Sequence, residues 1–198
     1  GIEFQYEHIV INPLEDVRTP PLLIRDAEKE EMILQLMEES AFAKTDGGYF
    51  LQNEELEYRF LYYILPKLQK LTQTYATTAV RNRIFRENHK PQIRVKVKKE
   101  RTNWLEFKFE MDGIPEREIK DVLQALEEKR KYYRLHNGSL LSLESKEYEE
   151  IQRFLQAAPI QQEDIEAGFE VPFVQGLRLM DTVDSQDTFK LEQSFRTF

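Results

Sequence analysis

Basic side chains are concentrated in two short stretches of an otherwise acidic chain. Residues 81–101 hold nine basic and two acidic side chains, and residues 129–134 place lysine and arginine around two tyrosines. Clustered cations release counterions when they meet a nucleic-acid backbone, so both stretches are candidates for contact with nucleic-acid phosphates. The candidate phosphate-contacting residues are Arg81, Arg83, Arg86, Arg94, Lys96, Lys98, Lys99, Arg101, Lys129, Arg130 and Lys131.

Neutralisation within the protein is the alternative explanation of the first stretch. A hairpin that turns near position 101 would place Lys96 or Arg94 opposite Glu106. Lys98 or Lys96 would then lie over the ring of Trp104. Because exposed charge runs are usually solvated surface, we weigh internal pairing slightly above phosphate contact. Neither interpretation selects a base sequence.

Three aromatic residues in or beside these stretches are candidates for docking on a partner protein. Trp104 falls on the charged side of its alternating run, and Tyr132 and Tyr133 lie within the second basic stretch. A tryptophan on a sheet face is at least as often covered by another element of its own fold, so packing remains the alternative.

Residues for catalysis or metal binding are scarce. The seven glycines never take the spacing of a phosphate-binding P-loop, the three histidines are far apart, and there is no cysteine. The carboxylate clusters Glu30/Glu31, Glu54/Glu55/Glu57, Glu127/Glu128 and Glu147/Glu149/Glu150 are expected on solvated helix exteriors. We therefore predict that this chain is not an enzyme by itself and holds no catalytic residue, metal or cofactor.

Composition narrows the class of protein. The 198 residues carry a net charge of −8 and are 40% hydrophobic, which excludes a disordered chain and argues against an indiscriminate binder of nucleic acid or anionic membranes. No stretch is long and apolar enough to cross a membrane, and the first residues do not resemble a signal peptide. We expect a cytoplasmic protein, with association with the nucleoid as an alternative. Because the chain starts at Gly1 without an initiator methionine, we also expect a piece of a larger protein.

The first half of the chain alternates strand and helix signals. Residues 2–11 are rich in strand formers, Asp26 is placed to cap a helix, and Asn53 a second one. Pro66 should kink the second helix, because it removes a backbone donor. Residues 74–80 look like another strand, which predicts the order β-α-β-α-β.

The second half gives clearer patterns. Two runs of period two, 92–98 and 104–111, predict an antiparallel hairpin with one buried face, and a helix follows Pro115. Asn137-Gly138 suits the type I′ turn of a second hairpin, and Ser145 caps the next helix. The order ββαββα indicates an α+β fold.

These patterns also predict the domain organisation. We expect one domain at 1–157, with subregions 1–90 and 91–157. Residues 158–198 show no strand signal and weak helical periodicity at 173–180 and 189–195, so we expect a helical connector there.

Several motifs resemble the bacterial Swi/Snf helicase-associated domain. The resemblance spans roughly residues 2–156 and is strongest over 103–144. It is carried by Asn103-Trp104-Leu105-Glu106-Phe107-Lys108-Phe109, Asp112-Gly113-Ile114, Lys131-Tyr132-Tyr133-Arg134-Leu135 and Asn137-Gly138-Ser139-Leu140-Leu141-Ser142-Leu143-Glu144, with Arg25-Asp26, Glu28, Phe42 and Gly47-Gly48 as further features.

The resemblance implies a context rather than a chemistry. In that family the module precedes an ATPase motor of two RecA-like lobes that translocates on double-stranded DNA, with ATP and Mg²⁺ bound by the motor. It implies that residues 158–198 lead into this motor, which would be the partner. Three hypotheses follow: an accessory domain that docks on or regulates the motor, a duplex-DNA-contacting module through residues 81–101 with 129–134, or a module that recruits another protein.

Overall fold

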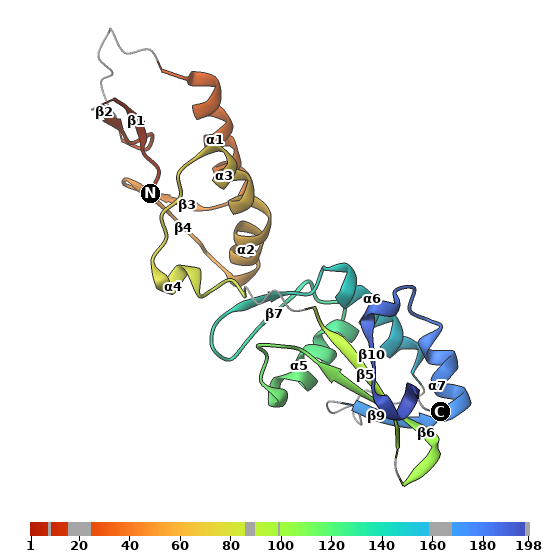
Figure 1. Ribbon diagram of the computed structural model, residues 1–198. Helices are drawn as coiled ribbons and strands as arrows, with labels where there is room; N and C mark the ends of the chain where they lie inside the picture. Colours follow the sequence, from red (N-terminus) through yellow and green to blue (C-terminus); the bar gives the residue numbers. More distant parts are fainter. Residues whose placement is uncertain (8, 16–24, 86–89, 99, 159–167, 197–198) are drawn as a thin grey trace. The chain divides into compact units, whose positions relative to one another are not determined.

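The structure is a computed structural model that describes residues 1–198 except 8, 16–24, 86–89, 99, 159–167 and 197–198. The chain divides into two compact units, residues 1–78 and residues 79–198. Both contain the same succession of two strands, a helix, two strands and a helix, and each strand pair is an antiparallel hairpin. The α+β class predicted from the sequence is confirmed (Figure 1).

The first unit packs two small hairpins against two helical segments. Its apolar core joins Phe4 and Ile11 of the first hairpin to Ile33 of the first helix and Leu68 of the last. The elements are β1 (Phe4–Tyr6), β2 (Ile9–Ile11), α1 (Ala27–Glu39), β3 (Ala43–Thr45), β4 (Gly48–Phe50), α2 (Glu54–Arg59), the π-helical turn η1 (Phe60–Ile64) and α3 (Leu65–Leu71).

Local sequence signals explain several of these elements. Asp26 and Asn53 cap α1 and α2 by accepting hydrogen bonds from the amides of Lys29 (3.1 Å) and Leu56 (2.9 Å), as predicted. Pro66 has no amide to donate, and the preceding turn is π-helical, with the Leu65 amide donating to the Phe60 carbonyl.

Two predictions for the first half are wrong. Residues 2–11 form a hairpin rather than one strand, because the backbone reverses at Glu7, where φ is 55°. Residues 74–80 contain no strand; the short helix α4 (Thr78–Arg81) begins there instead. The order β-α-β-α-β is therefore replaced by ββαββα followed by α4.

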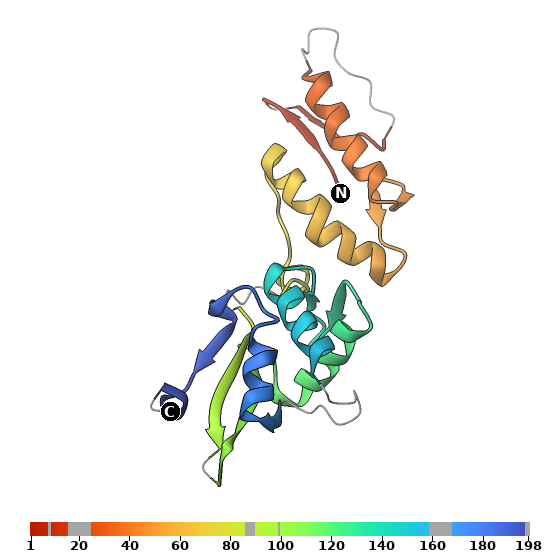
Figure 2. The same ribbon diagram turned by 90° about the vertical axis from the view of Figure 1, so that its right-hand side faces the viewer.

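The second unit is built on a four-stranded sheet. The strand order is β10-β5-β6-β9, with β10 parallel to β5 and the other pairs antiparallel. Its strands are β5 (Gln92–Lys98), β6 (Arg101–Glu110), β9 (Gly168–Pro172) and β10 (Phe189–Leu191). Three helices lie on the inner face of this sheet (Figure 2): α5 (Glu116–Glu127), α6 (Lys146–Ala157) and α7 (Phe173–Met180). Their apolar side chains belong to one core with those of the strands.

Phe154 of α6 lies at the centre of this core. Its ring contacts those of Phe107, Phe169 and Phe189, which come from β6, β9 and β10, at centroid distances of 5.1, 5.8 and 5.8 Å. A short 3₁₀ turn, η3 (Gln186–Thr188), precedes β10, and α8 (Gln193–Arg196) follows it. Residues 168–191 thus supply two strands and a helix to the fold.

The expectation that residues 158–198 contain only helices is therefore wrong in one respect. The helix at 173–180 is confirmed, but 168–172 and 189–191 are strands of the sheet. Both are short edge strands whose pairing partners lie at least sixty residues away along the chain, which no local pattern reveals. Whether this segment also leads into a motor stays a prediction.

A second hairpin of this unit lies outside the sheet. It consists of β7 (Tyr132–Arg134) and β8 (Leu140–Ser142). The type I′ turn predicted at Asn137-Gly138 is wrong, because Gly138 alone has a positive φ (92°). The Gly138 amide donates to the Leu135 carbonyl (2.9 Å) and the Leu135 amide to the Ser139 carbonyl (2.8 Å), the pattern of a three-residue loop with a glycine bulge.

Candidate nucleic-acid interface

The outer face of the four-stranded sheet is covered by alternating charges. The side chains of this face come from the positions that alternate with the buried residues of β5, β6 and β9. Lys96 on β5 pairs with Glu106 on β6 at 3.2 Å, as one interpretation of the sequence predicted. Lys98 is paired with Glu170 on β9, and this hydrogen bond raises the pKa of Lys98.

Arg94 is held by two carboxylates on this face. Its guanidinium is paired with Glu110 on β6, and its Nε lies 3.4 Å from Glu192, which follows β10. Lys190 on β10 reaches the other oxygen of Glu110 at 3.8 Å. The three cations that β5 contributes to the first basic stretch are therefore each matched by carboxylates of neighbouring strands.

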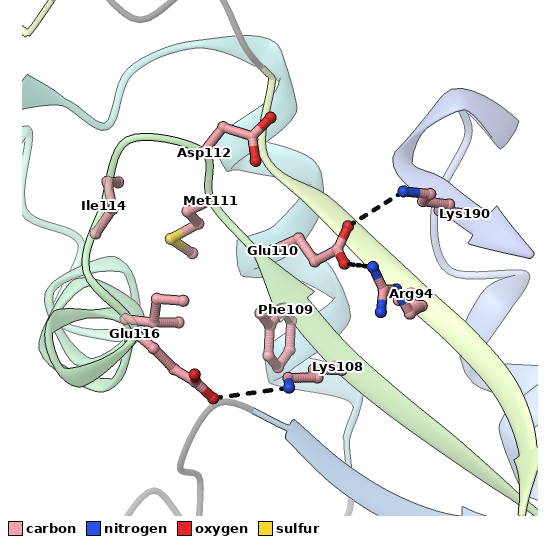
Figure 3. Close-up of a pocket in the computed structure, with 10 residues that line it drawn as sticks. Arg94, Lys108, Phe109, Glu110, Met111, Asp112, Ile114, Glu116 and Lys190 are labelled. Carbon is pink, nitrogen blue, oxygen red and sulfur yellow. Dashed lines mark ion pairs between the residues drawn. The ribbon is translucent and has the colours of Figure 1, made fainter. Parts of the chain in front are cut away.

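An open hollow of about 290 Å³ lies at one end of this charged face (Figure 3). Arg94, Lys108 and Lys190 line it, but Glu110 lies between Arg94 and Lys190, and Lys108 lies 3.7 Å from Glu116. An anion entering the hollow would have to displace these carboxylates. The hollow is thus a paired polar surface rather than a preformed phosphate site.

The start of the first basic stretch is separated from the sheet. Arg81 ends α4 and Arg83 follows it, and both side chains are exposed. The Arg83 carbonyl accepts a hydrogen bond of 2.7 Å from the Leu140 amide, the Phe85 amide donates to the Leu140 carbonyl, and Ile84 bridges Leu140 in parallel register. This segment therefore adds a third strand-like edge to the β7–β8 hairpin.

The second basic stretch is the other strand of that hairpin. Arg134 on β7 lies opposite Leu140, and its guanidinium donates to the Gly138 carbonyl at 2.8 Å. Lys129, Arg130 and Lys131 are exposed at the opposite end of β7. Residues 81–83 and 129–134, nearly fifty positions apart in sequence, are thus joined through β8.

The aromatic residues of this stretch have different surroundings. The guanidinium of Arg130 lies over the ring of Tyr132, 5.8 Å from its centroid. Tyr133 packs against the core instead, opposite the buried Leu141, and its hydroxyl lies 3.5 Å from Asp121. Burial, with the nearby carboxylates of Asp121 and Glu118, raises the pKa of Tyr133.

The remaining candidate residues lie on β6 or beside β5, or fall outside the described residues. Trp104 is half-buried on β6, with Pro172 of β9 as its neighbour in register. Arg86 and Lys99 lie outside the described residues, and only the backbone of Arg101 is described, as the first residue of β6. Lys90 pairs with Glu147 of α6 at 3.2 Å.

The prediction that the carboxylate clusters lie on helix exteriors is wrong for Glu30, Glu57 and Glu150, which are buried. Glu30 accepts hydrogen bonds from Arg25 and Tyr6, and Glu150 accepts one from Thr188. Helical spacing alone does not reveal that Glu30 and Glu150 are buried, because their hydrogen-bond partners lie outside their own helices. In the part of the chain that the structure describes, no three acidic or histidine side chains are grouped as metal ligands.

Sequence reasoning missed the carboxylates that neutralise the sheet face from the C-terminal segment. Glu170 and Glu192 lie beyond residue 157, in the segment expected to be a connector. A weak signal existed for Glu170, because it lies between Phe169 and Val171, whose side chains both point to the core. This alternation over a few residues is typical of a half-buried strand.

A buried carboxylate also shapes the hairpin loop. Glu118 of α5 is 2% exposed and accepts a hydrogen bond of 2.7 Å from the His136 amide. His136 Nδ1 lies 3.7 Å from the same oxygen. The loop that carries Gly138 is therefore anchored to α5, which holds the hairpin and the second basic stretch on the core.

Comparison with known proteins places the chain. The curated proteins and the solved structures that were compared include no match, and no helix among the described residues is long and apolar enough to cross a membrane. The sequence model of one protein family, described as bacterial SNF2 helicase associated, matches residues 1–198, the whole chain. The chain therefore belongs to the bacterial SNF2 helicase-associated family, as the sequence motifs indicated.

Proposed function

We propose that this chain is a non-catalytic regulatory module of a bacterial Swi/Snf-type ATP-dependent DNA translocase and that it docks on the ATPase motor. The family match over the whole chain carries this proposal. The motor, and not this chain, would bind ATP and Mg²⁺ and act on double-stranded DNA. The module would set how efficiently ATP hydrolysis is coupled to movement.

A deletion in the parent protein tests this proposal. The cut is best made after residue 198, because a cut at 157 would leave Phe169, Val171 and Phe189 without the sheet and helix that bury them. We expect the truncated protein to hydrolyse ATP with altered DNA stimulation or a changed ratio of ATP used to distance moved. Unchanged stimulation and unchanged coupling would contradict a regulatory role.

Docking on the motor would use the aromatic residues that remain accessible. Trp104 and Tyr132 are half-buried, whereas Tyr133 is turned to the core, so its substitution would report folding rather than docking. Trp104→Ala and Tyr132→Ala in the parent protein should change DNA-stimulated ATPase activity while the far-UV circular dichroism of this module stays the same. If ATPase activity is unaltered in both variants, docking uses another surface.

A further inference from the structure

Two sets of cations in the second unit differ in whether they are paired with carboxylates. Arg94, Lys96 and Lys98 of the sheet face are paired with glutamates. Lys129 and Lys131, beside β7, form no ion pair with any described residue. The difference matters because a cation that already has a carboxylate partner must give it up to meet a phosphate.

We infer that duplex DNA is contacted by one joined surface, which we call the hairpin surface, and not by the sheet face. The hairpin surface consists of Arg81, Arg83, Lys129, Arg130, Lys131 and Arg134. It exists only because Leu140 of β8 is hydrogen-bonded to residues 83 and 85 on one side and lies opposite Arg134 on the other. The inference rests on the proposed accessory role only for the choice of duplex DNA as ligand.

The dimensions of the hairpin surface suit a phosphate backbone. From Lys131 to Arg134 the strand advances about 10 Å, and residue 83 lies two strand spacings, again about 10 Å, from β7. Duplex DNA carries one charge per about 1.7 Å of axis, so cations at this separation face several phosphates at once.

The surface favours backbone contact over recognition of unpaired bases. Single-stranded nucleic acid is usually held by aromatic rings on which bases stack. Here one face of the Tyr132 ring is covered by the guanidinium of Arg130, and Tyr133 packs into the core. What the hairpin surface presents is positive charge, which binds without selecting a base sequence.

Two double variants of equal charge change separate the hairpin surface from the sheet face. Lys129→Gln with Lys131→Gln removes two hairpin cations, and Lys96→Gln with Lys98→Gln removes two sheet cations. Lys129 has a φ of 57°, and glutamine tolerates this conformation about as well as lysine, so the first variant adds no backbone strain. Each 198-residue chain is titrated into a labelled duplex of about 20 base pairs, and anisotropy is recorded between about 50 and 200 mM KCl.

The hairpin variant should bind the duplex at least about tenfold more weakly at the lowest salt, and its log–log salt slope should fall by about 2, because two phosphate contacts are lost. The sheet variant should bind like the wild type. Equal weakening by both variants, an unaffected hairpin variant, a wild-type chain that does not bind, or equal affinity for the single strand overturns the inference. None of these outcomes bears on the deletion experiment, which tests the accessory role separately.

Discussion

Lys96 on β5 lies directly opposite Glu106 on β6, and their side chains form a 3.2 Å ion pair on the outer face of the four-stranded sheet. The pair is partly exposed, with 40% of the lysine side chain and 27% of the glutamate side chain accessible to solvent. It belongs to a row of such pairs that cancels the charge of the strand with the most regular basic pattern. For the part of the first basic stretch that forms β5, the pair supports neutralisation within the protein rather than contact with phosphate.

A double-mutant cycle should find a small coupling between these two residues. Lys96→Ala, Glu106→Ala and the double variant are compared by urea denaturation at low and high salt. We expect a coupling free energy of about 0.2–1 kcal/mol that decreases with salt, because the pair is partly solvated. A coupling near zero at low salt would mean that the charges of the sheet face are independent and remain available to a ligand.

The β5–β6 hairpin could be predicted from sequence alone because its signals are local. Residues 92–98 and 104–110 alternate between core and surface, and the structure places Ile93, Val95 and Phe107 in the core as the period requires. The edge strands β9 and β10 could not be predicted in this way. β10 has three residues and pairs in parallel with β5, nearly one hundred positions earlier, so its strand conformation is set by the sheet and not by its own sequence.

Gly168→Ala tests whether the C-terminal segment is part of the fold. A Cβ at this position would lie 2.4 Å from the Phe107 carbonyl oxygen and 3.1 Å from the Lys108 Cα, and backbone cannot move aside as a side chain can. We expect the second unit to lose about 1–3 kcal/mol of unfolding free energy, the usual range for an overpacked site. Trp104, the single tryptophan, lies in this unit and reports its unfolding by fluorescence.

Glu170→Ala on the same strand is the matched control for Gly168→Ala. It removes only the partner of Lys98 on the outer face and should cost less than about 1 kcal/mol. Equal and negligible effects of both substitutions would show that β9 contributes little to stability, as a connector would.

The candidate site, like the fold, was predictable only where its sequence signals are local. Both basic stretches were visible as composition, but their joining depends on the Ile84–Leu140 bridge and could not be deduced from spacing. The partners Glu170 and Glu192 were missed because they belong to the edge strand β9 and to the residue after β10. Local charge density alone therefore identified the stretches without distinguishing the cations of the sheet face, which are paired with glutamates, from Lys129 and Lys131, which form no ion pair with a described residue.

The stability of the first unit should depend on pH through Glu30. Burial alone would raise the pKa of Glu30, but hydrogen bonds from Arg25 and Tyr6 outweigh it and hold the pKa below its ordinary value. A carboxyl group with a depressed folded-state pKa stabilises the protein above its unfolded pKa, about 4.3. That contribution is lost as the pH falls through the lower, folded-state pKa.

Glu30→Gln should therefore destabilise the first unit at neutral pH, and the difference from wild type should shrink as the pH falls below about 4. Far-UV circular dichroism follows the unfolding of both units, and Trp104 emission follows that of the second unit alone. The unfolding of the first unit is therefore obtained from the difference between the two signals. Glu31→Gln, on the exposed side of α1, is the control and should change neither quantity. A gap between wild type and Glu30→Gln that is constant with pH would contradict an ionised Glu30 in the folded unit.

Thr188 should stabilise the sheet edge through Glu150. Glu150 is 2% exposed on α6, one of its oxygens accepts a hydrogen bond from the Thr188 hydroxyl, and the other has no hydrogen-bond partner among the described residues. Thr188→Val keeps the shape and removes the donor, leaving a buried carboxyl group without its hydrogen bond, at a cost of about 1–3 kcal/mol. Thr188→Ser keeps the donor and should lose less stability.

Hydrogen exchange checks this prediction at the strand itself. Because β10 follows Thr188 directly, exchange at residues 189–191 should accelerate in Thr188→Val but not in Thr188→Ser. Equal protection in both variants would mean that the apolar contact of Phe189 with Phe154 alone holds the strand.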